Sequence, residues 1–234
     1  MNKTIKGYGF QPHLANLSTN AGAELMRYAK ERPDILSLAQ GEGDAPTPQF
    51  IVNAGKKALD EGKTFYAPPL GVPELREELS DYYKRIYNVD VPANRVFVTA
   101  SGSKAMSFSL QSLLGKGDDV LAITPIWKNL LNALEVVQAR VVEVPMDEDA
   151  GVWSFDINKI FDSYTPQTKV ILITTPSNPT GWVMPKDDMR KVLEFAREKD
   201  LWIISDEVYG RTMYGEKHAP SFLEIAEPDD KLYT

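Results

Sequence analysis

The stretch "KVILITTPSNPTGWVMPKDDMRKVLEFAREKDLWIISDEVYG" (Lys169–Gly210) contains two short apolar runs with an amphipathic segment between them. The runs "KVILITT" and "LWIIS" have the length and composition of buried strands. Between them, Met189, Val192, Leu193 and Ala196 follow the i, i+3, i+4, i+7 spacing of a helix with one core-facing side. The stretch therefore predicts a strand, a helix and a second strand parallel to the first.

The same alternation extends upstream of this stretch. The segments expected as strands are "RVFVTA" (95–100), "DDVLAI" (118–123) and "RVVEVPM" (140–146). The segments expected as helices are "PQFIVNAGKKALDEG" (48–62), "VPELREELSDYYKRIY" (72–87), "SKAMSFSLQSLLG" (103–115) and "WKNLLNALEVVQA" (127–139). We therefore expect an α/β fold with a mostly parallel sheet that is covered by helices on both faces.

The composition is that of a soluble globular protein, with 234 residues, 43% hydrophobic and 25% charged. A net charge of −7 provides no basic surface for nucleic acid or an anionic membrane. The absence of cysteine excludes disulfides and thiolate chemistry, and two distant histidines do not favour a metal site or a serine–histidine triad. Since neither a signal peptide nor a membrane span is evident, we expect a cytoplasmic protein.

Ligands of parallel sheets bind just past the carboxyl ends of the strands. The residues after each apolar run are therefore candidates for ligand binding. Ser101, Gly102 and Ser103 follow "VFVTA" and open a helix, whose free backbone N–H groups can bind a phosphate. The alternative is a serine N-cap with a tight turn. Neither a P-loop nor a G-x-G-x-x-G fingerprint is present.

The next two strand ends carry an aromatic and an amide side chain. Trp127 follows "VLAI", where its indole either stacks on a flat ligand or packs against the protein. Asn178 follows "ILITT" in "PSNPTG", where it is either an amide donor to a ligand or an ordinary turn residue.

The run "LWIIS" ends in two adjacent carboxylates, Asp206 and Glu207, and the phenol of Tyr209. Because charges are rarely buried unpaired, one carboxylate should meet a partner there, and strand alternation directs Glu207 away from it. Alternatively, Asp206 caps a helix or pairs with a nearby arginine. The alternative for Tyr209 is a half-buried phenol in the core. Together, the strand-end residues suit a flat, phosphorylated ring that contains nitrogen.

The motifs "YAPPLGVPELRE", "VTASGSKAM", "TTPSNPTG" and "SDEVYG" occur in an order that resembles the class I aminotransferases. This is the aspartate aminotransferase-like branch of the fold type I pyridoxal-phosphate enzymes, and the resemblance runs from about Ser37 to the end. It implies a large cofactor-binding domain over 48–234, incomplete at its C-terminal side, and an N-terminal arm with part of a small domain over 1–47. The implied cofactor is pyridoxal 5'-phosphate.

The resemblance implies a role for each strand-end residue. Asp206 would pair with the protonated pyridine nitrogen, Asn178 and Tyr209 would donate to the phenolic oxygen of the ring, and Asp206 and Tyr209 are the catalytic candidates. Trp127 would stack on the ring. Ser101, Gly102 and Ser103 would bind the phosphate.

Further residues match positions that contact the substrate or a second subunit. Gly41 in "LAQGEGD" matches a loop beside the substrate carboxylate, and Trp127 and Asn178 would also line the substrate site. Tyr66 matches a tyrosine that reaches the cofactor phosphate of the neighbouring subunit, which implies a homodimer with shared active sites. The alternative for Tyr66 is a loop aromatic packed under "APPLG".

Two elements of the family pattern are absent from the sequence, namely the S-F-S-K-like motif of the Schiff-base lysine and the C-terminal arginine that binds the substrate carboxylate. Lys231 is the latest lysine, and we interpret it as a solvated turn residue. We expect the chain to be part of a longer aminotransferase. The alternative is a naturally short descendant without catalysis.

The expected activity of the complete form is transfer of an amino group between an L-amino acid and a 2-oxo acid. A lysine outside this chain would move the α-proton, so we expect this chain alone to be inactive. Aspartate and 2-oxoglutarate are the first candidates, by resemblance alone. The alternatives are a pyridoxal-phosphate-dependent lyase or synthase on the same fold and a non-catalytic cofactor-binding protein.

Overall fold

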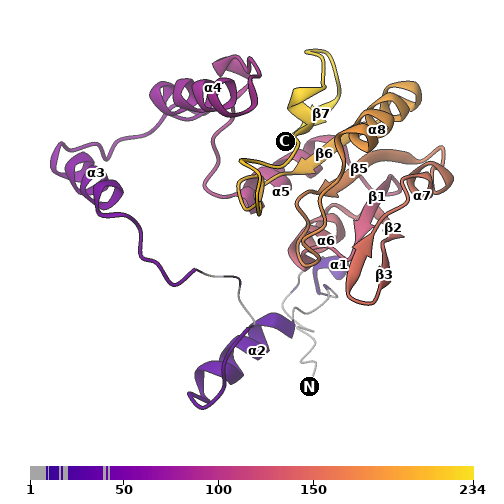
Figure 1. Ribbon diagram of the computed structural model, residues 1–234, viewed down its shortest axis with the longest axis horizontal. Coiled ribbons are helices and arrows are strands. Elements are labelled where there is room, and N and C mark those ends of the chain that lie inside the picture. Colours follow the sequence, from indigo (N-terminus) through magenta and orange to yellow (C-terminus); the bar gives the residue numbers. More distant parts are fainter. Residues whose placement is uncertain (1–8, 10, 16, 18–20, 39–40, 42) are drawn as a thin grey trace. The chain divides into compact units, whose positions relative to one another are not determined.

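The computed structural model describes residues 9, 11–15, 17, 21–38, 41 and 43–234 (Figure 1). Contacts divide the described residues into two units, one within 19–72 and the other within 1–18 and 73–234. This division falls after Val72. The division predicted from the sequence, between residues 47 and 48, stays a prediction.

The smaller unit contains two helices, α2 (Ala21–Lys30) and α3 (Gln49–Asp60). The chain leaves α3 through Gly62, which has a φ of +70° in the left-handed region that glycine adopts without strain. This is the helix end predicted from the sequence. None of the residues whose burial is described between 21 and 72 is buried, so these described residues form no core.

The larger unit is built on a five-stranded sheet with the order β2-β1-β5-β6-β7, and every pair is parallel. Its strands are β1 (Asp119–Thr124), β2 (Arg140–Pro145), β5 (Thr168–Thr174), β6 (Trp202–Asp206) and β7 (Leu232–Tyr233). An antiparallel hairpin of β3 (Asp147–Asp149) and β4 (Val152–Ser154) follows β2. The predicted parallel α/β sheet is confirmed.

Helices cover both faces of this sheet (Figure 1). They are α5 (Gly102–Leu113) and α6 (Lys128–Val137) on one face and α7 (Asn158–Asp162) and α8 (Lys186–Lys199) on the other. The larger unit also contains α1 (Pro12–Ala15), α4 (Pro73–Tyr87) and the short 3-10 turns η1 (Ala93–Arg95) and η2 (Phe222–Glu224).

Strand alternation divides the core into two clusters. Leu121, Ile171 and Ile203 pack toward α7 and α8, where the four predicted residues of α8 are buried. Val120 and Leu172, each one residue away, pack toward α5 and α6. Because both faces are covered, the strands read as continuous apolar runs.

The prediction of a strand at "RVFVTA" is wrong. Val96 has extended backbone angles, with φ −92° and ψ 123°, but no residue of 96–100 belongs to a strand. A strand requires hydrogen bonds to a neighbouring chain segment, and the apolar period of a sequence does not encode that partner. Phe97 is 68% exposed, so the segment does not contribute this side chain to the core.

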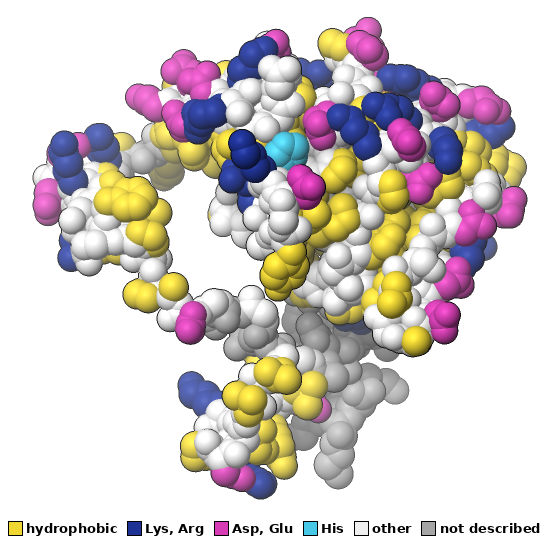
Figure 2. All heavy atoms as spheres, viewed as in Figure 1, with side chains coloured by type: hydrophobic (Ala, Val, Ile, Leu, Met, Phe, Trp, Pro, Cys, Tyr) yellow, Lys and Arg dark blue, Asp and Glu magenta, His cyan; other side chains and the backbone are white. Residues whose placement is uncertain are grey.

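On the face of the larger unit in Figure 2, acidic and basic side chains are interspersed, so the negative net charge is not gathered into one patch there. Among the described residues, no helix has the length and apolar character needed to cross a membrane.

Candidate active site

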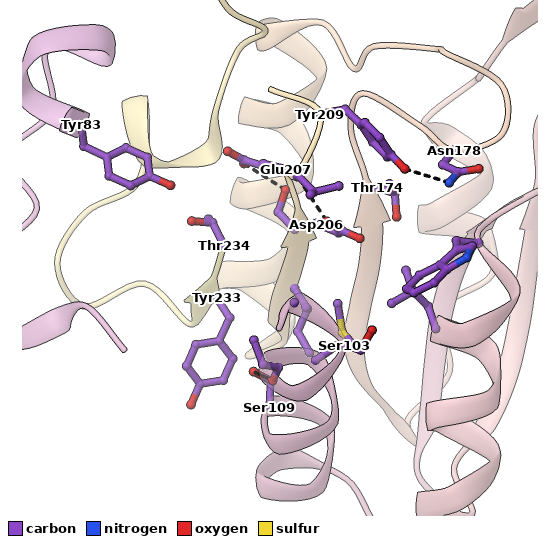
Figure 3. A pocket seen from close by; sticks show the side chains of 18 residues that line it. Tyr83, Ser103, Ser109, Thr174, Asn178, Asp206, Glu207, Tyr209, Tyr233 and Thr234 are labelled. Atoms are coloured by element: carbon purple, nitrogen blue, oxygen red, sulfur yellow. Dashed lines mark hydrogen bonds between the residues drawn. The ribbon is translucent and has the colours of Figure 1, made fainter. Parts of the chain in front are cut away.

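A cavity of about 580 Å³ lies at the carboxyl ends of the central strands (Figure 3). Its volume is within the range of about 300–1,000 Å³ that is typical of small-molecule sites. Six of the predicted site residues line it, namely Gly102, Ser103, Trp127, Asn178, Asp206 and Tyr209. The structure therefore brings together residues from three separate strand ends and one helix start, all within the larger unit.

Asp206 is the last residue of β6 and is half-buried in the cavity wall. Its Oδ1 accepts one hydrogen bond, from the backbone N–H of Val208 at 3.2 Å. Burial raises the pKa of the Asp206 carboxyl, and the hydrogen bond from Val208 opposes that rise. Within the described part of the chain, no basic side chain forms an ion pair with it. The site thus presents a partly desolvated acid without a cation.

Asn178 and Tyr209 lie next to each other although 31 residues separate them, and Asn178 Nδ2 donates a hydrogen bond to Tyr209 Oη at 2.9 Å. Asn178 belongs to the turn after β5, which Gly181 closes by donating its N–H to the Ser177 carbonyl at 2.8 Å. The phenol keeps its own O–H free to donate, because it acts only as the acceptor in this bond. The pair can therefore present donors to one oxygen of a ligand.

The N-terminus of α5 forms another part of the wall. Ser101 is its N-cap, and its Oγ accepts from the backbone N–H of Lys104 at 3.3 Å, which is the capping alternative considered for the sequence. Ser101 does not line the cavity, whereas Gly102 and Ser103 do. A Cβ added at Gly102 would meet no atom within 4 Å, so the space beside this helix start is open. Its unpaired N–H groups suit an anion.

The other residues considered from the sequence are Trp127, Gly41, Tyr66 and Lys231. Trp127 precedes α6, lines the cavity and is 37% exposed, so its indole is accessible to a ligand. Gly41 and Tyr66 belong to the smaller unit, and their predicted roles stay predictions. Lys231 pairs with Asp200 at 2.6 Å. None of the described residues that line the cavity is a lysine.

Sequence reasoning missed several residues of the cavity wall, among them Thr174, Tyr83 and Tyr233. Thr174 is the last residue of β5, so the strand-end rule had the information needed to find it. Glu207 also contributes to the wall, but its Oε1 accepts hydrogen bonds from Ser205 Oγ and from the backbone N–H of Phe222, each at 3.0 Å. Burial raises the pKa of the Glu207 carboxyl.

Comparisons with known proteins identify related sequences and structures. A family model described as "Aminotransferase class I and II" matches residues 33–234. A probable aspartate aminotransferase of Methanocaldococcus jannaschii is 38% identical over 203 residues, which are 87% of this chain and 53% of the relative. The chain thus spans about half the length of the curated relatives that it matches.

Solved structures show the same fold. The aspartate aminotransferase of Thermus thermophilus with maleate matches with a TM-score of 0.85 and 31% identity, over 92% of this chain and 57% of that chain. An alanine aminotransferase of Pyrococcus furiosus matches with a TM-score of 0.85 and 27% identity, over 93% and 56%.

These similarities confirm the predicted family and its pyridoxal-phosphate dependence. The family model covers most of the sequence, including every strand of the cavity-forming sheet. The chain therefore belongs to the family of class I and II aminotransferases.

Proposed function

We propose that this chain forms the cofactor site of a pyridoxal-phosphate-dependent aminotransferase. The observation that carries the proposal is the carboxylate of Asp206, which is partly desolvated in a cavity without a cationic partner among the described residues. A buried carboxylate is costly unless a charge or hydrogen bonds compensate it. A protonated pyridine nitrogen would supply that charge.

The cofactor, when bound, supplies an electron sink for the electrons released at the α-carbon of an amino acid. Asp206 would keep the ring nitrogen protonated and so maintain that sink. At about 4 Å and an effective dielectric of about 20, such a charge pair amounts to about 4 kcal/mol before desolvation. This is large enough to fix a protonation state, because one pKa unit corresponds to about 1.4 kcal/mol.

The other wall residues fit the remaining groups of the cofactor. Gly102 and Ser103, at the start of α5, would bind the phosphate through backbone N–H groups and a hydroxyl, and Ser101 would hold that helix start by capping it. Asn178 and Tyr209 would donate to the phenolic oxygen and stabilise its anion.

Trp127 and Asn178 would also face the substrate. For the substrate itself, aspartate with 2-oxoglutarate is our first candidate because relatives at 34–38% identity are named aspartate aminotransferases. Gly41 would lie beside the substrate carboxylate. We place the enzyme in the cytoplasm.

We propose a homodimer with shared active sites, and the exposed apolar side chains of the smaller unit support this proposal. Its exposed apolar side chains include Phe50, Leu59, Phe65 and Tyr66, and it buries none of its described residues. Exposed apolar side chains that lie together are typical of an interaction site. In the proposed dimer, Tyr66 would reach the cofactor phosphate of the other subunit. Light scattering after gel filtration measures the mass in solution, and a monomer at micromolar concentration would contradict the dimer.

Titration of the purified protein with pyridoxal 5'-phosphate, followed by cofactor absorbance, tests the cofactor site. We expect saturable binding that Asp206→Ala weakens at least tenfold, since loss of about 1.4 kcal/mol suffices for that factor. Asp90→Ala is the matched control, because Asp90 is exposed and lies outside the cavity. Equal affinities of the three proteins would refute the role of Asp206.

The reaction class is tested on a form that includes the Schiff-base lysine, by incubation with aspartate in the presence and absence of 2-oxoglutarate. An aminotransferase forms more keto acid than enzyme only when the acceptor is present. Turnover without an acceptor would instead identify a lyase.

A further inference from the structure

Thr174 has a buried hydroxyl without a hydrogen-bond partner, and no other buried side-chain polar atom in the described part of the chain shares this property. The residue is 5% exposed, ends β5 and lines the cavity. Buried hydroxyls are ordinarily paired, because an unpaired one costs free energy. An exception at a ligand cavity calls for a functional explanation.

The neighbour of Thr174 in the sheet is Asp206. The two residues are paired in the parallel register of β5 and β6, so their side chains leave the same face of the sheet from strands about 4.8 Å apart. Figure 3 shows both side chains directed into the cavity. Asp206 Oδ1 accepts from Val208, whereas Oδ2 has no hydrogen bond among the described residues. An unused donor thus stands beside an unused acceptor.

We propose that Thr174 is a positioning residue, which donates its hydroxyl hydrogen to the Asp206 carboxylate when the cationic ring of pyridoxal phosphate is bound. The inference rests on the proposed function. The cation holds Asp206 in its charged form, and a hydroxyl binds a charged carboxylate more strongly than a neutral one. With Val208 on one oxygen and Thr174 on the other, the carboxylate would be fixed toward the ring nitrogen.

The adjacent residue provides a structural contrast. Thr175 is fully buried, and its Oγ1 accepts from the backbone N–H of Met184 at 2.9 Å. Its hydroxyl therefore serves the fold without a ligand. Replacement of the two threonines by valine should change stability in opposite directions.

The experiment compares Thr174→Val, Thr174→Ser and Thr175→Val by melting temperature without cofactor and by pyridoxal-phosphate affinity. Thr174→Val should raise the melting temperature by about 2–4 °C, since it removes an unpaired buried hydroxyl. It should weaken cofactor binding roughly tenfold, since a bond to a charged acceptor is lost. Thr174→Ser should retain wild-type affinity. Thr175→Val should lower the melting temperature and leave affinity within about twofold.

Whether Thr174 affects cofactor binding through Asp206 is tested by combining Thr174→Val with Asp206→Ala. In that background we expect no further loss of affinity from Thr174→Val, because the acceptor is gone. Losses that multiply would mean direct contact with the ligand and would overturn the positioning role. In the single variant, loss of the donor should also shift the acid limit of cofactor binding to higher pH, because it destabilises the charged carboxylate.

The outcomes separate this inference from the proposed function. A wild-type protein that binds the cofactor while Thr174→Val binds equally well would refute the role of Thr174 alone. A wild-type protein that does not bind would refute both, because the hydroxyl would then have no cation to act with.

Discussion

Asp119 links the starts of two strands to the turn before a third, at the ends of the strands away from the cavity, and its replacement by asparagine should destabilise the fold without changing the site. Its carboxylate, 1% exposed, accepts from Arg140 Nε at 2.6 Å and from a second nitrogen of the same guanidinium. It also accepts from Thr165 Oγ1 at 2.7 Å. The carboxylate thus connects the starts of β1 and β2 to the turn before β5.

The magnitude follows from this geometry. Breaking a fully buried ion pair costs about 3–5 kcal/mol. The Arg140 side chain is 63% exposed and regains water when its partner is lost, so we expect about 2–3 kcal/mol for Asp119→Asn. Asp90→Asn is the control, since Asp90 is 83% exposed in its pair with Lys84 and should cost at most about 1 kcal/mol.

Urea unfolding, monitored by circular dichroism, measures the change in unfolding free energy for Asp119→Asn and for Asp90→Asn. The guanidinium of Arg140 lowers the pKa of Asp119 in the folded state, so its stabilisation is complete above the unfolded pKa of about 3.9. That stabilisation is lost as the pH falls through the folded pKa. The difference between wild type and Asp119→Asn should therefore be constant from about pH 5 to 8 and shrink below about pH 4. A loss equal to that of Asp90→Asn, or one that persists unchanged at low pH, would refute the reasoning.

Asp119→Asn should also leave pyridoxal-phosphate affinity within about twofold, because the five steps from Asp119 to Thr124 along β1 span about 17 Å. Glu207→Gln should change the pH dependence of stability: burial raises the pKa of Glu207, so its contribution is complete below the unfolded pKa and is lost as the pH rises through the folded one. Thermal melts should accordingly show the variant gaining on wild type as the pH rises above the unfolded pKa of about 4.3, and parallel profiles would contradict this. Tyr209→Phe removes the acceptor of the Asn178 amide and a donor to the ligand, so titration should show roughly threefold to tenfold weaker cofactor binding; unchanged affinity would exclude Tyr209 from the site.

The sequence predicts the sheet well because its signals are local. The runs at β1, β5 and β6 are short, apolar and separated by amphipathic segments, and burial on both faces produces this pattern directly. The failure at "RVFVTA" has the opposite cause, since its composition suits a strand while pairing depends on a distant segment.

The site residues also divide into those that local sequence predicts and those that depend on distant parts of the chain. Trp127, Asn178 and Asp206 were predicted because they come directly after strands, and parallel strands bring such residues to one edge. Thr174 was missed although it ends β5, because a threonine in an apolar run is an ordinary β-former. Its unpaired state depends on which atoms surround Oγ1, and that information is absent from local sequence.

The adjacent carboxyl groups of Asp206 and Glu207 have different surroundings and different roles. Glu207 binds the backbone N–H of Phe222, 15 residues later, and so closes the loop that contains Tyr209. Asp206 forms one hydrogen bond, to Val208, and no ion pair among the described residues, so the fold gains little from its charge. A carboxyl group retained for folding would be hydrogen-bonded as Glu207 is. The contrast within one dipeptide therefore favours a ligand as the partner of Asp206, and it requires that Asp206→Ala weaken cofactor binding far more than Glu207→Gln.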